Sequence, residues 1–448
     1  MRCLYLDNFR GFADTIIPIR DVNFLVGENS TGKTSVLTML QMMSAKALLF
    51  GTHAAAATHS SVTEMLPFAH HAEMVSAHSA DRSYFRLGLA NTTRRVKNEP
   101  SRFSGVLATF HDRDGMSFVS QITCTVRQRE LAIRIEKKGV SYRVSEAPKV
   151  SGEEDVEAVL KQWVRQQAEQ DGAEFTEIPA PKGVNAEQVQ LLVILGVVAA
   201  QTTEEQKGQI SDFFPDLWPE PVYLAPIRTK PLRTYSEPYM PFSPEGSHTP
   251  YLIRRMLNSA EEATKFRDFI DKIGSAGGLF QKIDIKYFGE ASGAGPFEVD
   301  AYLDQQALNL SWVGYGVSQS LPILVELLFR PKQTWFAIQQ PEVHLHPRAQ
   351  ASLGDAFFEM AHVDQKTLLV ETHSDFAIDR FRMNYRAKRP ARARSKLPIS
   401  QVIFFERRDG HNTATPIPIN DKGELSEDQP DGYRRFFLSE GLRLIGEE

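Results

Sequence analysis

The stretch that decides the fold is Val22–Thr34, which reads VNFLVGENSTGKT. Its first half is an apolar run typical of a buried strand, and its second half matches the pattern G-x-x-x-x-G-K-S/T. Residues 35–49 follow without proline or glycine, so their spacing predicts a helix from Ser35 to Leu49. A glycine loop between a strand and a helix is the setting in which this pattern binds nucleotide phosphates.

The chemistry of the loop predicts its ligands. Glycines let the backbone turn tightly, so that consecutive N–H groups point at phosphate oxygens, and the helix N-terminus adds its positive end. We expect Lys33 to neutralise the β and γ phosphates and the Thr34 hydroxyl to bind Mg²⁺. The predicted cofactors are therefore ATP and Mg²⁺, and the predicted nucleotide-binding residues of the loop are Gly27, Asn29, Ser30, Thr31, Gly32, Lys33, Thr34 and Ser35.

Composition narrows the class. A net charge of -5 over 448 residues argues against a surface built wholly for nucleic acid, although it leaves a local basic patch open. The two cysteines, Cys3 and Cys124, are too few for a disulfide framework, which favours the reducing cytoplasm. The longest apolar stretch, Leu191–Ala200, is shorter than the roughly 20 residues that span a bilayer, so we expect a buried helix and no membrane association.

The pattern of apolar residues changes along the chain. Residues 83–145 alternate apolar and polar side chains, which predicts antiparallel β structure. Residues 150–215 are charged and predicted helical, without the long heptad run of a coiled-coil arm. An α/β portion begins at Pro221. Short strands are also predicted at Cys3–Leu6, Pro221–Leu224, Val402–Glu406 and Pro416–Asn420.

Three further motifs follow in order in the second half. The first is VGYGVSQSLP at residues 313–322. The second is the apolar strand Trp335–Ile338, followed by QQPEVHLHP at residues 339–347. The third is the apolar strand Thr367–Val370, followed by ETHSD at residues 371–375.

With the glycine loop and NFRGF at residues 8–12, this order resembles the ABC-type ATPase heads of the RecF, SMC and OLD group. The nearest resemblance is to stand-alone bacterial ATPases, including the Septu and PARIS anti-phage ATPases, which carry G-F/Y-G-x-S-Q-x-L-P, PE-x-HLHP and THS-D/E motifs. The resemblance covers most of residues 1–40 and 220–435. It implies an α/β fold, namely an ABC-type P-loop ATPase head with an N-terminal antiparallel β lobe and a helical insertion. Residues 1–145 would form the N-terminal part of the head, 146–220 the insertion, and 221–448 the C-terminal part.

The resemblance also implies roles for residues. Gly314, Gly316, Ser318 and Gln319 would form the signature that reaches the γ-phosphate of ATP held by a second copy, giving a homodimer or higher homo-oligomer. His373 would be the switch histidine, contacting the γ-phosphate or the attacking water. Taken alone, His373 would be better explained as a buried structural histidine, and the set of motifs favours the switch role.

The strand that ends at Ile338 departs from the family pattern. It should deliver an acidic residue to Mg²⁺, and a second acidic residue usually follows, but here both are glutamines, Gln339 and Gln340. The resembled ATPases often read Glu-Gln-Pro-Glu here, so Gln339 is the departure and Gln340 is not. An amide supplies no negative charge and cannot act as a base, so we expect slow or absent hydrolysis. The predicted catalytic residues are Gln339, Gln340, Glu342 and His373, and the predicted metal positions are Thr34 and 339.

Two explanations of Gln339 are open. The glutamine is either natural, in a nucleotide-gated scaffold, or a Glu-to-Gln substitution that traps the ATP state, and we favour the second from the sequence. Glu342 is the nearest carboxylate along the chain and could substitute in part.

Three other groups of residues each have two interpretations. In the basic turn Pro226–Arg233, Arg228 and Arg233 could contact phosphate or a partner, or lie at the surface. Residues 386–396 hold six basic side chains, which suit contact with nucleic acid or an acidic partner, although a solvated loop fits them slightly better. Five histidines could form a metal site, although a partly exposed helical segment fits them better: His53, His59, His70, His71 and His78.

The function predicted from this resemblance is an ATPase sensor or scaffold of a bacterial anti-phage system that controls a separate effector, a nuclease or toxin. The alternative is a RecF- or SMC-like DNA-repair ATPase, and a nucleic-acid partner therefore stays open. A third hypothesis is a nucleotide-gated oligomer without enzymatic activity. The chain after His373 lacks the acidic cluster of a Toprim nuclease, so no nuclease activity is expected here.

Overall fold

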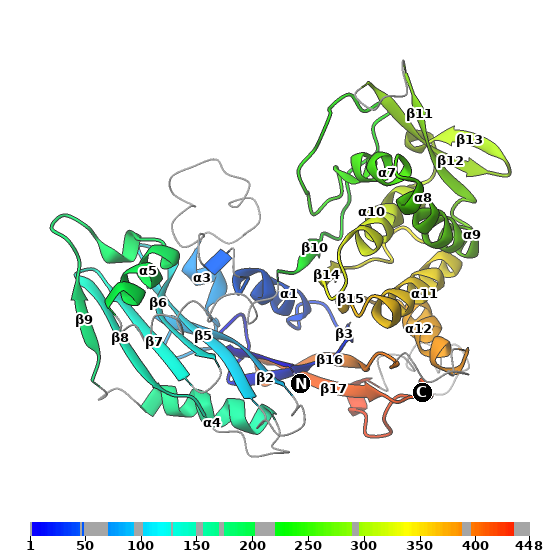
Figure 1. The fold of residues 1–448 in the computed structure, drawn as a ribbon. Coiled ribbons are helices and arrows are strands. Elements are labelled where there is room, and N and C mark those ends of the chain that lie inside the picture. Colours follow the sequence, from blue (N-terminus) through cyan, green and yellow to red (C-terminus); the bar gives the residue numbers. More distant parts are fainter. Residues whose placement is uncertain are drawn as a thin grey trace. The chain divides into compact units, whose positions relative to one another are not determined.

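The structure is a computed structural model that describes residues 2–44, 47–48, 70–93, 102–126, 129–148, 156–169, 174–201, 220–288, 295–387 and 396–433. The chain forms two compact units, and each consists of several chain segments (Figure 1). Unit 1 contains Met1–Arg20, Glu28–Glu220 and Phe405–Pro416. Unit 2 contains Asp21–Gly27, Pro221–Phe404 and Ile417–Glu448.

Unit 1 is built on an eight-stranded antiparallel sheet in the order β2-β1-β4-β5-β6-β7-β8-β9. Strands β4 to β8 lie side by side in chain order, which confirms the antiparallel β region predicted from alternation. The bounds are β1 Arg2–Asp7, β2 Thr15–Ile19, β4 Tyr84–Thr93, β5 Arg102–Arg113, β6 Met116–Val126, β7 Arg129–Glu136, β8 Gly139–Glu146 and β9 Thr176–Pro179.

Helix α4 buries one face of this sheet. Its apolar residues recur at positions 156, 159, 160, 163 and 164, the spacing of one helical face, and they pack against Phe103 and Leu107 of β5. The Trp163 indole donates to the buried carboxylate of Glu130 at 2.6 Å, which fixes the helix on the sheet. The other helices of unit 1 are α1 Lys33–Met42, α3 His71–Met74, α5 Leu191–Gln201 and the 3₁₀ helix η2 Ala186–Gln188, and α4 spans Val156–Glu169.

Several sequence predictions for unit 1 need correction. Helix α1 ends at Met42 and not at Leu49, because the Ser44 hydroxyl accepts from the Ala47 amide at 3.2 Å and begins a separate turn. Strands β2 and β9 were not predicted, and β9 places a strand within the segment expected to be helical. The predicted helix at Leu191–Ala200 exists as α5, but Val193 is 50% exposed, so it is not fully buried.

Unit 2 contains a six-stranded sheet in the order β10-β14-β15-β3-β16-β17, in which β10, β14, β15 and β3 are parallel. Helix α11, Pro347–Val363, connects β14 to β15 as the crossover that parallel strands require. The last residues of β16 and the first of β17 belong to unit 1. The bounds are β10 Val222–Leu224, β14 Trp335–Gln339, β15 Thr367–Glu371, β3 Val22–Gly27, β16 Ser400–Arg408 and β17 His411–Ile419.

A small three-stranded sheet and further helices complete the described part of unit 2. The sheet has the order β11-β12-β13, with β11 Lys282–Tyr287, β12 Phe297–Leu303 and β13 Gln306–Asn309. The helices are α7 Thr249–Leu257, α8 Ala260–Phe266, the π-helix η4 Arg267–Asp271, α9 Lys272–Gly277, the 3₁₀ helix η5 Leu310–Trp312, α10 Tyr315–Phe329 and α12 Asp375–Ala387. Among the described residues, no helix is long and apolar enough to cross a bilayer.

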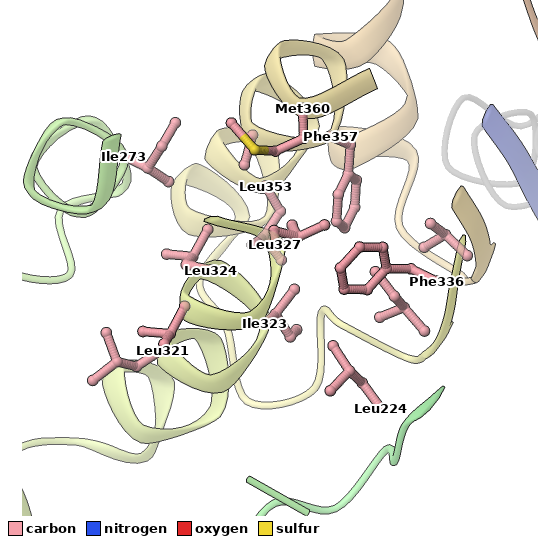
Figure 2. Close-up of a cluster of buried hydrophobic side chains, with 14 of the residues drawn as sticks. Leu224, Ile273, Leu321, Ile323, Leu324, Leu327, Phe336, Leu353, Phe357 and Met360 are labelled. Carbon is pink, nitrogen blue, oxygen red and sulfur yellow. The ribbon is translucent and has the colours of Figure 1, made fainter. Parts of the chain in front are cut away.

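The core of unit 2 joins α10 and α11 to the parallel strands. Figure 2 shows Leu324 and Leu327 of α10 facing Leu353 and Phe357 of α11, with Phe336 of β14 beside them. All five side chains are fully buried. The helix that carries the predicted signature is therefore packed against the strand that ends at Gln339.

Candidate nucleotide-binding site

The loop after β3 has the backbone geometry that its glycines predict. Gly27, Ser30 and Gly32 have positive φ values of 148°, 64° and 100°. At Gly32, a Cβ atom would lie 2.5 Å from the ring of Phe12, so no other residue fits without movement. Gly32 is followed at once by α1, whose N-terminus faces the loop.

The side chains of the loop divide into inner and outer sets. Thr31 and Lys33 are buried, whereas Asn29, Ser30 and Thr34 are exposed. The Lys33 ammonium donates to the Glu28 carbonyl at 2.6 Å, and the Thr31 hydroxyl donates to the same oxygen at 2.8 Å. These contacts hold the lysine across the mouth of its own loop, where a phosphate could replace the carbonyl as acceptor.

The parallel strands of unit 2 bring a second set of residues to one edge. Strands β14, β15 and β3 end together, since Gln339 is opposite Glu371 and Glu371 is opposite Leu25. In open α/β sheets, ligands bind outside the carboxyl ends of the strands. The phosphate loop begins at this edge, because β3 ends at Gly27.

Gln339 is held between two side chains from neighbouring strands. Its amide oxygen accepts from the Tyr223 hydroxyl of β10, and its amide nitrogen donates to Glu371 Oε2 of β15 at 3.3 Å. Burial, and then the charge of Glu371, raise the pKa of Tyr223, so the phenol stays protonated and donates. Glu371 and Tyr223 were missed by the sequence analysis, although the acidic residue before Thr372 was visible in ETHSD.

Glu342 joins the segment after β14 to the switch segment after β15. Its carboxylate accepts from the Thr372 hydroxyl at 2.8 Å and from the His373 backbone N–H at 2.7 Å. Burial raises the pKa of Glu342 in spite of these hydrogen bonds. Gln340 adopts a positive φ of 38° and donates its N–H to the Glu371 carbonyl at 2.8 Å. The His373 side chain is exposed, so it is not the buried structural histidine that was the alternative to a switch residue.

The signature segment has an exposed start and a buried continuation. Trp312, Gly314 and Tyr315 are exposed at the beginning of α10, and a Cβ on Gly314 would meet nothing within 4 Å. Ser318 is only 5% exposed, and its hydroxyl donates to the Tyr315 carbonyl at 2.9 Å. A Cβ on Gly316 would lie 3.3 Å from the His344 carbonyl, so only glycine allows this approach without adjustment.

Arg228 links the signature helix to β14. Its backbone N–H donates to Gln319 Oε1 at 3.2 Å, and its Nη2 donates to the Gln339 carbonyl at 3.0 Å. The side chain is 4% exposed, and neither Nε nor Nη1 has a hydrogen-bond partner in the described part of the chain. Arg228 is thus a buried residue and not a surface turn. Gln319 uses its amide on this arginine, whereas Arg233 lies over the exposed ring of Trp312 at 5.6 Å.

Two other predicted groups fall wholly or partly outside the described residues. His53, His59 and residues 388–395 of the basic run lie there. Of the remaining histidines, His71 is buried and contacts Ser117 Oγ at 3.0 Å and the Arg82 carbonyl at 3.1 Å, a structural role. No cluster of His, Cys, Asp or Glu suited to a metal occurs in the described ranges.

The residues present fit a nucleotide and its metal unequally well. The loop backbone and Lys33 suit the phosphates, as their φ angles and exposed turn show. Mg²⁺ prefers carboxylate and hydroxyl oxygens as ligands, so the uncharged amide of Gln339 is a poor ligand for it. The nearest carboxylate given by its hydrogen bonds is that of Glu371, 3.3 Å from the amide nitrogen.

Comparisons with known families agree with this assignment. Residues 1–87 match the family described as "AAA ATPase domain". Residues 245–379 match the family described as "AAA domain, putative AbiEii toxin, Type IV TA system". No curated protein matches the chain. The two matches cover the phosphate loop and the signature-to-switch region, and they support an ATP-binding P-loop ATPase.

Similar solved structures are SMC heads. An SMC head bound to the C-winged helix domain of ScpA has 11% identity and a TM-score of 0.45, over 93% of this chain and 97% of that chain. An Smc head with an extended coiled coil, bound to the C-terminal domain of ScpA derived from Pyrococcus furiosus, has 9% identity and a TM-score of 0.43. The match covers 99% of this chain and 100% of that chain. The SMC head domain from Thermotoga maritima has 11% identity and a TM-score of 0.37, over 93% of this chain and 99% of that chain. At these scores, the fold assignment rests on the chain's own strand order and phosphate loop.

Proposed function

We propose that this chain is an ATP-binding head that serves as sensor or scaffold of a bacterial anti-phage defence system and controls a separate nuclease or toxin. The observation that carries the proposal is the shared edge of unit 2. There the strand leading into the phosphate loop lies beside β15, which leads into the switch segment, and β14 follows. A nucleotide bound by the loop is the ligand that this order of strands suits.

ATP would be shared between two copies of the chain. The start of α10 supports this, because its exposed N–H groups lack intrahelical acceptors and form the positive end of a helix dipole. Gly314 leaves that end open, with Trp312 and Tyr315 exposed beside it. Since the Ser318 hydroxyl is turned to the Tyr315 carbonyl, we propose that backbone N–H groups make the first contact with the second copy's γ-phosphate.

Two links within unit 2 would carry the state of the nucleotide from the strand ends to the switch and signature segments. Glu342 ties the segment after β14 to the backbone of His373. Arg228 ties Gln339 to Gln319 of the signature helix. A change at the strand ends would therefore be passed to the surface that meets the second copy.

The defence context rests on a family description and on the motif resemblance. The family that matches residues 245–379 is named for a putative toxin of a Type IV TA system. The proposed partner is accordingly a separate effector protein, held inactive or released according to whether the heads are joined.

ATP binding is tested with the full chain and the variants Lys33→Ala and Lys265→Ala. Calorimetric titration should show binding for the wild type, a loss of at least tenfold in affinity for Lys33→Ala, and no change for Lys265→Ala, whose side chain is on the surface. Equal binding by Lys33→Ala and the wild type would refute the assigned loop.

Head association is tested with Gly314→Glu. The position has room for a side chain at an ordinary φ of -59°, so the variant should fold and bind ATP normally. The added carboxylate should repel the γ-phosphate of the second copy. Native mass spectrometry should show ATP-dependent dimers for the wild type and monomers for the variant, and dimers of Gly314→Glu would contradict the sandwich. A defence role further requires that Lys33→Ala abolish phage protection in cells carrying the effector gene.

A further inference from the structure

We infer that Glu371 supplies the carboxylate that the site lacks at position 339, and that Gln339 is its positioning residue. The inference rests on the proposed binding of ATP. It places the metal-binding carboxylate on β15 and not at the end of β14, where the linear motif puts it. It also predicts phosphate release that is measurable and depends on Glu371.

The pairing of strands brings the two residues together. Gln339 and Glu371 are partners in the parallel register of β14 and β15, so their side chains lie on the same face of the sheet. They are 6% and 5% exposed, and the Gln339 amide nitrogen lies 3.3 Å from Glu371 Oε2. A carboxylate is therefore within one hydrogen bond of the position where an acidic residue was expected.

Glu371 also lies on the strand that neighbours β3, the strand leading into the loop. Strand β15 lies between β14 and β3, and Glu371 is opposite Leu25, two residues before the loop begins at Gly27. Gln339 is one strand further away.

The hydrogen bonds of Gln339 explain why an amide is found there. The Tyr223 hydroxyl donates to its oxygen, which turns the amide nitrogen toward Glu371. Without a bound cation, a glutamate at 339 would place a second negative charge beside Glu371 in a buried position, which disfavours ionising both groups. The glutamine instead donates to the carboxylate and holds it in place, so it suits this site as a natural residue.

Glu342 is excluded as the replacement carboxylate. One of its oxygens accepts from Thr372 and the other from the His373 N–H. These bonds commit it to shaping the switch segment. Glu342 is thus a matched control, since it is a half-buried carboxylate in the same unit, near the same strand ends, with a different expected role.

When bound, Mg²⁺ neutralises phosphate charge and prefers carboxylate oxygen. The chain's own contribution is to hold that oxygen still. Tyr223 fixes Gln339, Gln339 fixes Glu371, and the Gln340 N–H donates to the Glu371 backbone carbonyl at 2.8 Å.

The test compares the wild type with Glu371→Gln, Glu342→Gln and Gln339→Glu, all in the full chain. The measurements are ATP affinity with and without Mg²⁺, the Mn²⁺ electron paramagnetic resonance signal in the presence of ATP, and phosphate release. Glu371→Gln should keep metal-free ATP binding, which also shows that it is folded. It should lose about tenfold or more of the Mg²⁺-dependent gain in affinity, weaken Mn²⁺ binding, and nearly abolish phosphate release.

Glu342→Gln should alter phosphate release but keep the Mg²⁺ dependence of ATP affinity. If Glu371→Gln does not fold, Glu371→Asp replaces it and should show an intermediate Mg²⁺ dependence, since its carboxylate is withdrawn by one methylene. The inference is overturned if Glu371→Gln, or Glu371→Asp in its place, leaves the Mg²⁺ dependence unchanged. It is also overturned if Gln339→Glu alone raises turnover by about tenfold or more. Absence of ATP binding by the wild type would refute the proposed function instead.

Discussion

Replacing Arg228 with methionine should leave unit 2 as stable as before, or make it more stable, while it weakens ATP-dependent association. The reason is that the guanidinium is buried with two of its nitrogens lacking partners among the described residues. Most substitutions of a buried, hydrogen-bonded residue destabilise a protein, so the expected direction is unusual.

The magnitude follows from two opposing contributions. Burial lowers the pKa of Arg228 to about 10, and relative to its ordinary value this corresponds to about 3 kcal/mol against the charged form. The substitution removes that penalty and keeps most of the side-chain volume. It loses the Nη2 bond to the Gln339 carbonyl, worth about 1.5–3 kcal/mol. The backbone bonds with Gln319 stay. The net change is between zero and a gain of about 2 kcal/mol.

The assay is hydrogen exchange of the backbone amides in β14 and α10, which reports stability inside unit 2. Arg228→Met should exchange at the wild-type rate or more slowly, whereas Arg228→Lys keeps the charge and should gain nothing. Association with ATP, followed by native mass spectrometry, should weaken about tenfold in Arg228→Met, because the link between Gln339 and the signature helix is cut. A loss of stability greater than about 2 kcal/mol in Arg228→Met would refute the reasoning.

Three further outcomes are expected. Gly32→Ala should lower stability by about 2 kcal/mol and ATP affinity at least tenfold, measured by urea unfolding and calorimetry, because its φ is 100° and its Cβ would strike Phe12. Glu130→Ala should destabilise unit 1 by about 3–5 kcal/mol, seen in unfolding followed by tryptophan fluorescence, since it removes the acceptor of Trp163. Burial raises the pKa of Glu326, but bonds from His248 and Arg330 outweigh it and hold that pKa below its ordinary value. Its contribution is therefore present above the ordinary glutamate pKa and is lost as pH falls through the lowered one, so Glu326→Gln should cost about 1–3 kcal/mol at pH 7 and progressively less in acid.

Much of the fold was predictable because its signals are local. The phosphate loop, the apolar strands before Gln339 and Glu371, and the alternating strands of unit 1 each occupy a continuous stretch. The boundaries failed where one side chain decides them. Ser44 ends α1 early through a bond to Ala47, and no periodicity in the sequence shows this.

The sequence motifs predicted most residues of the candidate site one by one, but not that Gln339 and Glu371 lie side by side. Gln339 and Glu371 are 32 residues apart, and only the register of β14 and β15 brings them together. A motif read along the chain therefore finds an acid missing at 339 and cannot see its neighbour. The position of Arg228 stayed open between a contact and a surface turn for a related reason, because only the fold reveals its hydrogen bonds to Gln319 and Gln339.

The position of β3 within its sheet also governs how the chain must be made. The side chain of Asn23 bonds to the Leu368 carbonyl at 3.1 Å and to the Gln401 amide at 2.8 Å, and these partners lie 345 and 378 residues downstream. At a synthesis rate of roughly 5–20 residues per second, the apolar strand waits on the order of 20–70 s for its neighbours to be translated. Meanwhile β4 to β8, which pair in chain order, can already fold as a unit. A ribosome that stops before β15 releases a chain that lacks Phe405–Pro416 of unit 1 and leaves the phosphate-loop strand unpaired, so translation through β16 is the condition for a nucleotide site.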